Sequence, residues 1–551
     1  DGAGNTSMYV LRNRVQDFST LPYYAKPNTV LQITGDEGDT LTDYYVKFEN
    51  DGVWAECIAP STSLGLDNST MPHALVNNSD GTFTFKQLDY TDRDCGNNTT
   101  NPDPSFVNRV IQNVTFYKNR LGFLSGENLI LSENTSYFNY FVTTATQVLD
   151  TDVIDIAASG TTVNTLRSSV AFNDTLLLFS DNGQYKLATS GNTAISPLTA
   201  ILNLVSSFEH NRNVRPVTAG KYAYFAQDRN DNTAIREYYS DEDSLTNDGI
   251  DITENGYQII SNNIEDTLCV IASDTADSQT APYTTSSAVT ATHGNRIYVY
   301  KYFFDNAEKV QSSWSFWELE GVKILGGLGT DSFIYLFTAE GTNTKLYRID
   351  LRNLKIPSLG FNIYLDKRVT ASATYDANTG KSTFTSPYGA LTNLLAVNAT
   401  TGTNLITVNT SGSTYTVEGN HTSLYIGTAF TSTYELSPQF IREQSSRGTI
   451  SITNGRYQIK YITFDFVDTG YFRVEVTPDN RDTLTKQFTG YVIGLPTTLI
   501  DRPSISSGAL RVPIQAENTK FTLQLKNDSH LPIYIAAADI EGFYHTRSRR
   551  A

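Results

Sequence analysis

The acidic segment "DTDVIDI" carries three carboxylates, Asp150, Asp152 and Asp155, that could together hold a cation. A calcium loop of the EF-hand kind places oxygen ligands at alternate positions, with Gly sixth and Glu twelfth. Counted from Asp150, the sixth residue is Asp155 and the twelfth is Thr161. The spacing does not match this loop, so the sequence predicts solvated or turn-capping carboxylates and no metal ligand.

The histidines are too scattered to mark a catalytic centre. They stand at positions 73, 210, 293, 421, 530 and 545, and none belongs to an HExxH pair. The chain also lacks the GxSxG turn that exposes a nucleophilic serine, the GxxxxGK[ST] phosphate loop and the dinucleotide motif GxGxxG. The sequence therefore predicts no catalytic residue, no cofactor-binding residue and no cofactor.

The cysteines support neither a disulfide framework nor a zinc site. Cys57, Cys95 and Cys269 are odd in number and widely spaced, without a CxxC pair. We expect incidental thiols, as in a protein assembled in a reducing compartment.

The segment "SSWSFWEL" is apolar on both faces if it is a strand. Trp314 and Phe316 then point to one face, and Trp317 and Leu319 point to the other. Such a strand is sandwiched between two layers of structure. Stacking of the tryptophans on a sugar ring is the alternative function for this pair.

Composition indicates a sheet-rich protein that does not grip nucleic acid. The 551 residues include 33 Tyr and 28 Phe but only 2 Met, and aromatic residues suit pleated sheets. Lys plus Arg is 41 against 58 Asp plus Glu, a formal net charge of −17. Binding to phosphates needs clustered cations, so this balance argues against a protein that holds nucleic acid, although not against one past which it travels.

Five hairpin-like units follow one another along the chain. Each has an apolar run, a polar turn and a second apolar run, which is the signature of a β-hairpin. Recurring multi-strand units of this kind predict a β-propeller. The five units are residues 121–132, 176–188, 222–239, 297–319 and 333–350.

Three other segments give weaker indications of secondary structure. "SPLTAILNLVSSFEH" has helical spacing after a possible cap at Ser196, but its sheet-like surroundings make a strand equally possible. Residues 370–430, rich in Thr, Ser, Asn and Gly, indicate a loop-rich β excursion. In "YQIKYITFDF" the apolar phase changes between Tyr461 and Ile462, which predicts a β-bulge.

Several long motifs resemble one known family. They are "FYKNRLGFLSGENLILSENTSYFNYF" at 116–141, then "DTDVIDI", "LLLFSDNGQYKL", "STMPHALV" at 69–76, "NPDPSFV" at 101–107, "VQSSWSFW" at 310–317 and "YELSPQ" at 434–439. Together they resemble tail tubular protein B, the nozzle protein of short-tailed bacteriophages. The likeness is collinear from about residue 40 to the end.

The resemblance implies a structural virion protein rather than an enzyme. Its relatives form a homohexamer below the adaptor ring of tail tubular protein A, at the distal part of the tail. That ring continues the channel for double-stranded genomic DNA, which passes without specific binding, and offers docking places for tail fibres before contact with the host cell surface. Assembly takes place in the host cytoplasm.

By position, the resemblance implies four regions in a mainly β fold with few helices and a β-propeller core. They are a β-rich platform on the neck side at 1–100, propeller blades at 101–355, a loop-rich β insertion or nozzle tip at 356–435, and a C-terminal β domain at 436–551. Because the family carries a longer N-terminal region, we expect the platform to be incomplete in this chain.

Two other classes of function remain open at this point. A tail-associated polysaccharide depolymerase needs a cleft with two carboxylates about 5–10 Å apart. A secreted, glycosylated adhesion protein needs glycans at sequons such as Asn68, Asn113, Asn134 and Asn173.

Overall fold

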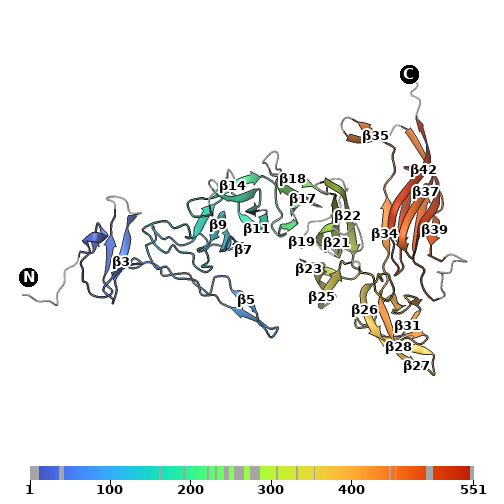
Figure 1. Ribbon diagram of the computed structural model, residues 1–551, viewed down its shortest axis with the longest axis horizontal. Helices are drawn as coiled ribbons and strands as arrows, with labels where there is room; N and C mark the ends of the chain where they lie inside the picture. Colours follow the sequence, from blue (N-terminus) through green and yellow to red (C-terminus); the bar gives the residue numbers. More distant parts are fainter. Residues whose placement is uncertain are drawn as a thin grey trace, which may run out of the picture. The chain divides into compact units, whose positions relative to one another are not determined.

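The computed structural model is built almost wholly of β-strands (Figure 1). It describes residues 12–35, 42–160, 163–172, 174–189, 194–219, 222–229, 232–240, 247–253, 266–272, 286–293, 295–305, 308–330, 333–352, 354–445, 448–452, 455–491 and 501–546. Within these ranges the helical structure is a single 3-10 turn, η1 (Phe18–Thr20), and no helix is long and apolar enough to cross a bilayer. The chain divides into two compact units, Asp1–Leu351 and Arg352–Ala551.

The first unit begins with a small sheet in the strand order β1-β2-β3-β4. Its strands are β1 (Arg14–Val15), β2 (Val30–Ile33), β3 (Tyr44–Phe48) and β4 (Trp54–Cys57). Leu31, Ile33 and Val46 form its buried core. The Trp54 indole nitrogen donates to the Pro22 carbonyl at 2.9 Å, which ties the loop before β2 to the sheet.

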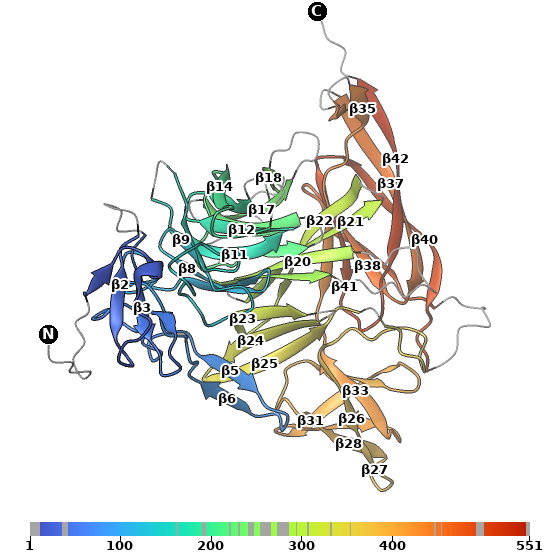
Figure 2. The ribbon, with the colours of Figure 1, turned by 60° about the vertical axis from the view of Figure 1, so that its left-hand side comes forward.

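Five successive sheets follow, and they are the blades of a β-propeller (Figure 2). Blade 1 holds β7 (Asn113–Tyr117), β8 (Arg120–Ser125), β9 (Asn128–Leu131) and β10 (Ile154–Ala157), and blade 2 holds β11 (Leu166–Phe172), β12 (Thr175–Ser180), β13 (Gln184–Thr189) and β14 (Ala200–Ser206). Blade 3 holds β15 (Val217–Ala219), β16 (Tyr222–Arg229), β17 (Asn232–Ser240) and β18 (Asn247–Asp251). Blade 4 holds β19 (Asp266–Ala272), β20 (Ser286–His293), β21 (Arg296–Asp305) and β22 (Glu308–Glu318), and blade 5 holds β23 (Lys323–Thr330), β24 (Phe333–Glu340) and β25 (Asn343–Asp350).

Every blade is an antiparallel meander whose strands lie in chain order. The first strands of the blades contact one another in succession, from β7 through β11, β15 and β19 to β23. This succession of inner strands is what a propeller requires. All five hairpins predicted from the sequence are present as β8–β9, β12–β13, β16–β17, β21–β22 and β24–β25.

The blades are held together by apolar side chains that alternate between the two faces of each strand. On β12, Leu176 and Leu178 pack toward blade 1, whereas Leu177 and Phe179 pack toward blade 3. Because successive side chains of a strand point to opposite faces, a strand that is apolar at every position is buried on both. Each fully buried Leu or Phe contributes roughly 1.5–3 kcal/mol.

The same alternation continues through the later blades. On β16, Phe225 packs toward blade 2 and Tyr224 toward blade 4. On β21, Tyr300 packs toward blade 3 and Val299 toward blade 5. The expectation for the tryptophan strand is confirmed at Trp314 and Trp317, which pack against the clusters on either side of blade 4.

The segment with competing helix and strand signals is the strand β14. After a turn that begins at Ser196, β14 pairs with β13 over six residues of that strand, and Ala200 and Leu202 are buried in the cluster between blades 1 and 2. The neighbouring Ile201 and Leu204 are exposed. Pairing with β13 and burial against blade 1 therefore override the local helical spacing.

The second unit consists of two β-sandwiches. The smaller one pairs the sheet β26-β33-β29-β30 with the sheet β27-β28-β32-β31. These strands are β26 (Asp366–Ser372), β27 (Thr374–Asp376), β28 (Lys381–Thr385), β29 (Leu394–Asn398), β30 (Asn404–Leu405), β31 (Thr407–Ser411), β32 (Thr414–Glu418) and β33 (Ser423–Thr428). Phe384, Tyr415 and Leu424 lie in the core between the sheets.

The larger sandwich pairs the sheet β34-β41-β38-β39 with the sheet β40-β37-β42, and a separate hairpin β35-β36 accompanies it. The strands are β34 (Ser432–Leu436), β35 (Arg442–Ser445), β36 (Gly448–Ser451), β37 (Gly455–Thr469), β38 (Phe472–Pro478), β39 (Leu484–Phe488), β40 (Ser506–Glu517), β41 (Phe521–Asn527) and β42 (Ile535–Thr546). The register of β37 shifts between Ile459 and Tyr461 against both neighbours, so the predicted bulge is present one residue earlier than expected.

An ion pair between the partly buried Lys309 and the buried Glu237 joins blades 3 and 4. The Lys309 ammonium lies 2.6 and 2.5 Å from the two carboxylate oxygens of Glu237, and the Tyr224 hydroxyl donates to the same carboxylate at 2.8 Å. The rings of Tyr222, Tyr300 and Tyr302 surround the ammonium at 5.1–5.5 Å, within the range of cation–π attraction. Burial opposes the charge, but the contacts with Glu237 outweigh it and raise the pKa of Lys309.

We predict that Lys309→Met destabilises the propeller by about 3 kcal/mol, because it leaves the buried Glu237 carboxylate without its cation. Urea unfolding followed by tryptophan fluorescence measures the change, since Trp314 and Trp317 lie in the same blade as Lys309. The double variant with Glu237→Gln should recover part of the loss. Lys355→Met is the matched control, because the Lys355–Asp468 pair is exposed and contributes less than about 1 kcal/mol. Equal effects of Lys309→Met and the control would contradict this account.

Candidate functional site

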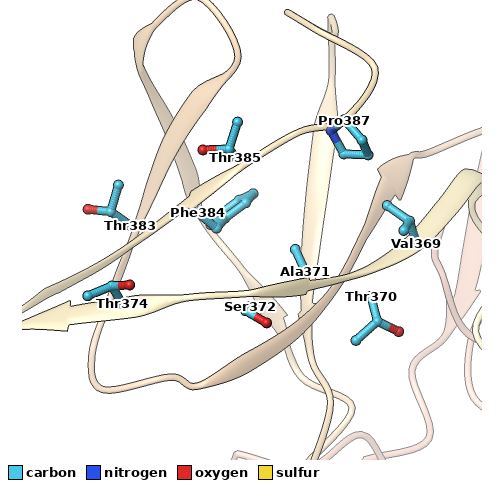
Figure 3. Close-up of a pocket in the computed structure, with 9 residues that line it drawn as sticks. All are labelled: Val369, Thr370, Ala371, Ser372, Thr374, Thr383, Phe384, Thr385 and Pro387. Carbon is cyan, nitrogen blue, oxygen red and sulfur yellow. The ribbon is translucent and has the colours of Figure 1, made fainter.

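A pocket of about 530 Å³ lies in the smaller sandwich (Figure 3). Strand β26 of one sheet continues into β27 of the other, and the pocket forms where the chain changes sheets, beside β28. Its lining is made of neutral side chains, several of them hydroxyls: Val369, Thr370, Ala371, Ser372, Thr374, Thr383, Phe384, Thr385 and Pro387. No carboxylate or imidazole lines it, so it holds neither an acid–base pair nor a metal-binding set.

The acidic segment 150–156 performs a structural task. The Asp152 carboxylate is buried, which raises its pKa, and it accepts the backbone N–H of Leu149 at 2.7 Å. Asp155 accepts the backbone N–H of Ser105 at 2.8 Å and the side-chain amide of Asn128 at 2.9 Å. Both carboxylates therefore hold backbone segments together.

Buried Arg120 explains why two of the quoted motifs belong together. Its guanidinium donates to the carbonyls of Ser132, Asp152 and Asp150 at 2.7, 2.6 and 2.9 Å. The segment 116–141 and the segment 150–156 are thus fastened by one side chain whose charge is spread over main-chain oxygens. Its burial lowers the pKa of Arg120 from its ordinary value.

The described histidines lie apart and contact main-chain or neutral groups. His210 is buried beside Phe179 and lies 3.1 Å from the Val214 carbonyl, and His530 lies 2.8 Å from the Gly402 carbonyl. His73 and His421 lie 2.8 Å from the carbonyls of Met71 and Glu418. His545 is exposed, and the side chain of His293 lies outside the described residues.

The two described thiols are poorly suited to nucleophilic chemistry. Cys57 and Cys95 are buried and free, and burial raises their pKa values to about 11 and about 12. A thiol with a raised pKa carries little thiolate at neutral pH. The side chain of Cys269 lies outside the described residues. Among the side chains that are described, no three of His, Cys, Asp or Glu gather in a metal-binding group.

Comparison with known proteins identifies what this arrangement is for. The family described as bacteriophage nozzle protein matches residues 1–551. The chain is also 30% identical over 580 residues to the tail tubular protein gp12 of Escherichia phage T7, covering 100% of this chain and 70% of that protein. The chain belongs to the bacteriophage nozzle protein family. It is a structural protein of the phage tail, as the resemblance of its motifs implied.

Solved structures resemble this nozzle protein only loosely. The Dos1 propeller is 8% identical, with a TM-score of 0.27, over 72% of this chain and 88% of that one. An exo-β-1,3-galactanase from Phanerochaete chrysosporium is 11% identical, with a TM-score of 0.23, over 78% and 95%. At these TM-scores neither likeness bears on function.

The tryptophan strand of the nozzle protein serves packing. The Trp314 indole nitrogen donates to the Ile252 carbonyl at 2.9 Å, and its ring lies 5.0 Å from that of Tyr300. Phe316, which shares the face of Trp314, is 55% exposed and carries the Arg296 guanidinium over its ring.

Two features escaped sequence reasoning. The first is the ion pair between Lys309 and Glu237, which lie about 70 positions apart in the chain, so no local sequence pattern predicts it. The hairpin of β5 (Ala74–Asn77) and β6 (Phe83–Lys86) stands as a two-stranded sheet with exposed apolar side chains. The run "ALVNNSDGTFTF" carried a hairpin signal, but a pattern alone does not say whether its apolar face is covered.

We predict that His210 makes the nozzle protein less stable in acid. Burial lowers the pKa of His210 to about 4, below the usual value of about 6.5. Between these pH values the unfolded chain binds a proton that the folded chain does not, so stability falls as the pH falls through this window, by about 3 kcal/mol in all. His210→Gln, which keeps a donor toward Val214, should lose that much less stability between pH 6.5 and 4 in urea unfolding. Identical pH dependence of the variant and the natural chain would contradict the prediction.

Proposed function

We propose that six copies of this chain form a ring whose lumen is the DNA-ejection channel at the distal end of the tail. The ring lies below the adaptor ring of tail tubular protein A, offers docking places for tail fibres and meets the host cell surface on infection. Genomic double-stranded DNA passes through it without specific binding. The match of the nozzle family to residues 1–551 is the observation that carries this proposal.

The construction of the blades supports a load-bearing wall. Strands such as β12 are packed on both faces, so movement of one blade against the next would expose buried Leu and Phe side chains. The Lys309–Glu237 pair adds a fixed polar contact between two blades. A propeller packed in this way transmits force as a rigid body, without bending at a hinge between blades.

The four regions expected from the sequence become assignments within this proposal. Residues 1–100 serve as the platform toward the adaptor, and 101–355 as the propeller. Residues 356–435 form a loop-rich β insertion or the nozzle tip, and 436–551 a C-terminal β domain. Buried free thiols at Cys57 and Cys95 are in keeping with assembly in the reducing host cytoplasm.

We also propose that the chain carries no enzymatic activity. A polysaccharide depolymerase needs two carboxylates facing each other across a cleft, whereas the pocket beside β28 is lined by neutral side chains. The carboxylates of Asp152 and Asp155 are engaged with backbone N–H groups. The depolymerase alternative therefore gains no support from these residues.

Native mass spectrometry and electron microscopy of the purified chain test the ring. We expect six copies in a closed ring with a central channel, because head-to-tail contacts between identical chains give a closed ring where the rotation from one copy to the next closes. The same preparation should release no sugar from host polysaccharide. Rings of another copy number, or measurable sugar release that stops on mutation of a carboxylate, would overturn the proposal.

We predict that the negative charge of the chain is expressed in the lumen, as rings of Asp and Glu repeated by the six-fold symmetry. A channel must not hold the genome, and several phosphate contacts with Lys or Arg would slow release by orders of magnitude. At about 0.15 M salt the screening length is about 8 Å, so only wall charges near the duplex act on it.

A structure of the assembled ring checks this prediction. The expected lumen is lined mainly by carboxylates along its length, with any Arg rings confined to the closed tip. Replacement of lumenal acids by lysine should then slow genome ejection. A lumen lined mainly by Lys and Arg, or ejection at normal speed after these replacements, would refute it.

A further inference from the structure

The hairpin β5–β6 has an apolar face that no other described part of the chain covers. The pairs Leu75–Phe85 and Asn77–Phe83 place Leu75, Phe83 and Phe85 on one face of the hairpin. These three side chains are 66%, 64% and 73% exposed, and the His73 ring stacks on Phe85 at 5.1 Å. Among the described residues no third strand joins this sheet.

Such a hairpin is incomplete in physical terms. A two-stranded hairpin alone is marginally stable in water, because it lacks a layer on which to bury its side chains. The exposed parts of Leu75, Phe83 and Phe85 amount to on the order of 400 Å² of apolar surface. One side of a specific protein interface buries about 800 Å², of which a little over half is apolar. The hairpin thus exposes nearly the apolar area that one partner contributes to a stable contact.

Blade 5 has an exposed edge strand to which a further strand could be added. Blades 1 to 4 have four strands each, whereas among the described residues blade 5 has three and ends at β25. Phe337 on β24 and Leu346 on β25 are paired across the ladder, and they are 49% and 57% exposed on the face turned away from blade 4. An eight-residue edge strand of this kind is a template for a further strand.

We propose that the β5–β6 hairpin of one copy adds to the β25 edge of a second copy and completes its fifth blade. The four-residue strands β5 and β6 fit within the length of β25. Main-chain hydrogen bonds across the new edge supply affinity, and the Phe83 and Phe85 rings extend the apolar row of Phe337 and Leu346.

The partner is a second copy rather than the same chain. The hairpin and β25 belong to the same unit, yet they are not paired there, and the hairpin remains a separate sheet. A donor on one surface and an acceptor on another make a head-to-tail contact, which repeats around a ring. The inference rests on the proposed ring and names the contact that links its subunits.

Cross-linking in rings of mixed isotopic composition tests the contact. Phe85 is replaced by photoreactive benzoylphenylalanine in the full chain, and ¹⁴N- and ¹⁵N-labelled chains are assembled together. We expect cross-links from position 85 of one isotopic form to residues 343–350 of the other. Cross-links within one chain only, or to other segments in intact six-membered rings, would overturn this inference and leave the proposed function standing. Failure of any ring to form would count against both.

Paired variants give a second test. Phe83→Ser with Phe85→Ser on the donor side, and Leu346→Asp on the acceptor side, should each weaken ring assembly at least tenfold in sedimentation experiments. The thermal unfolding midpoint of the unassembled chain should stay unchanged, because these side chains are exposed in it. Val163→Ser with Leu198→Ser is the matched control, since these side chains are 79% and 72% exposed in the loops that precede strands β11 and β14 of blade 2. Assembly of both variants as strong as that of the control would refute the contact.

Discussion

The face-to-face packing of neighbouring blades is the constraint on which the rest of this structure depends. A sheet with four short strands has two faces to bury, and here most faces are covered by the next sheet. This explains why runs such as "LLLF" on β12 and "YAYFA" on β16 are apolar or aromatic at every position. It also explains the high content of Tyr and Phe, whose rings fill the space between sheets and pack in tilted or edge-to-face pairs.

Blades 1 and 5 each have one face that does not pack against a neighbouring blade of the series, and these two faces differ. The outer face of blade 1 is covered by the chain itself, because Phe123 and Ile130 pack against Met71, Tyr90 and Phe106 from the preceding segment. Arg120 and Asp152 fasten the loops around this cover. In the part of the chain that the structure describes, no comparable layer covers Phe337 and Leu346 of blade 5. Among the described residues, blade 1 thus has a covered outer face and blade 5 an exposed one.

The sequence predicted what depends on local alternation and missed what depends on distant contacts. The five central hairpins were predictable, because each keeps its apolar period of two and a polar turn within about twenty residues. The segment that forms β14 was ambiguous, because its apolar residues fit both a helix and a strand and only the pairing with β13 decides between the two. The bulge in β37 was visible as a change of phase, but the ladder places it at Lys460 rather than after Tyr461. The pairing of Glu237 with Lys309 arises from the neighbouring positions of two blades, which no spacing in the chain encodes.

The residues that could do chemistry and the motifs that carry the family resemblance are different parts of the sequence. The spacing of the carboxylates in the segment 150–156 predicted solvated or turn-capping groups rather than metal ligands, and the structure shows Asp152 and Asp155 bound to backbone N–H groups. Family motifs such as "STMPHALV" carried the identity of the chain, although their residue types suggest no reaction. Part of that motif is now seen to form β5, with His73 stacked on Phe85. In a nozzle protein, recurring motifs can mark contacts that hold a wall together rather than groups that react.

Electron cryomicroscopy of the intact tail tests the central claim most directly. The account predicts that the propeller of β7–β25 fits the density at the distal end, repeated around a channel wide enough for duplex DNA, with its blades in the arrangement described for the free chain. Density for this chain on the outside of the tail, away from the channel, would contradict it. So would blades that separate from one another when the genome is ejected.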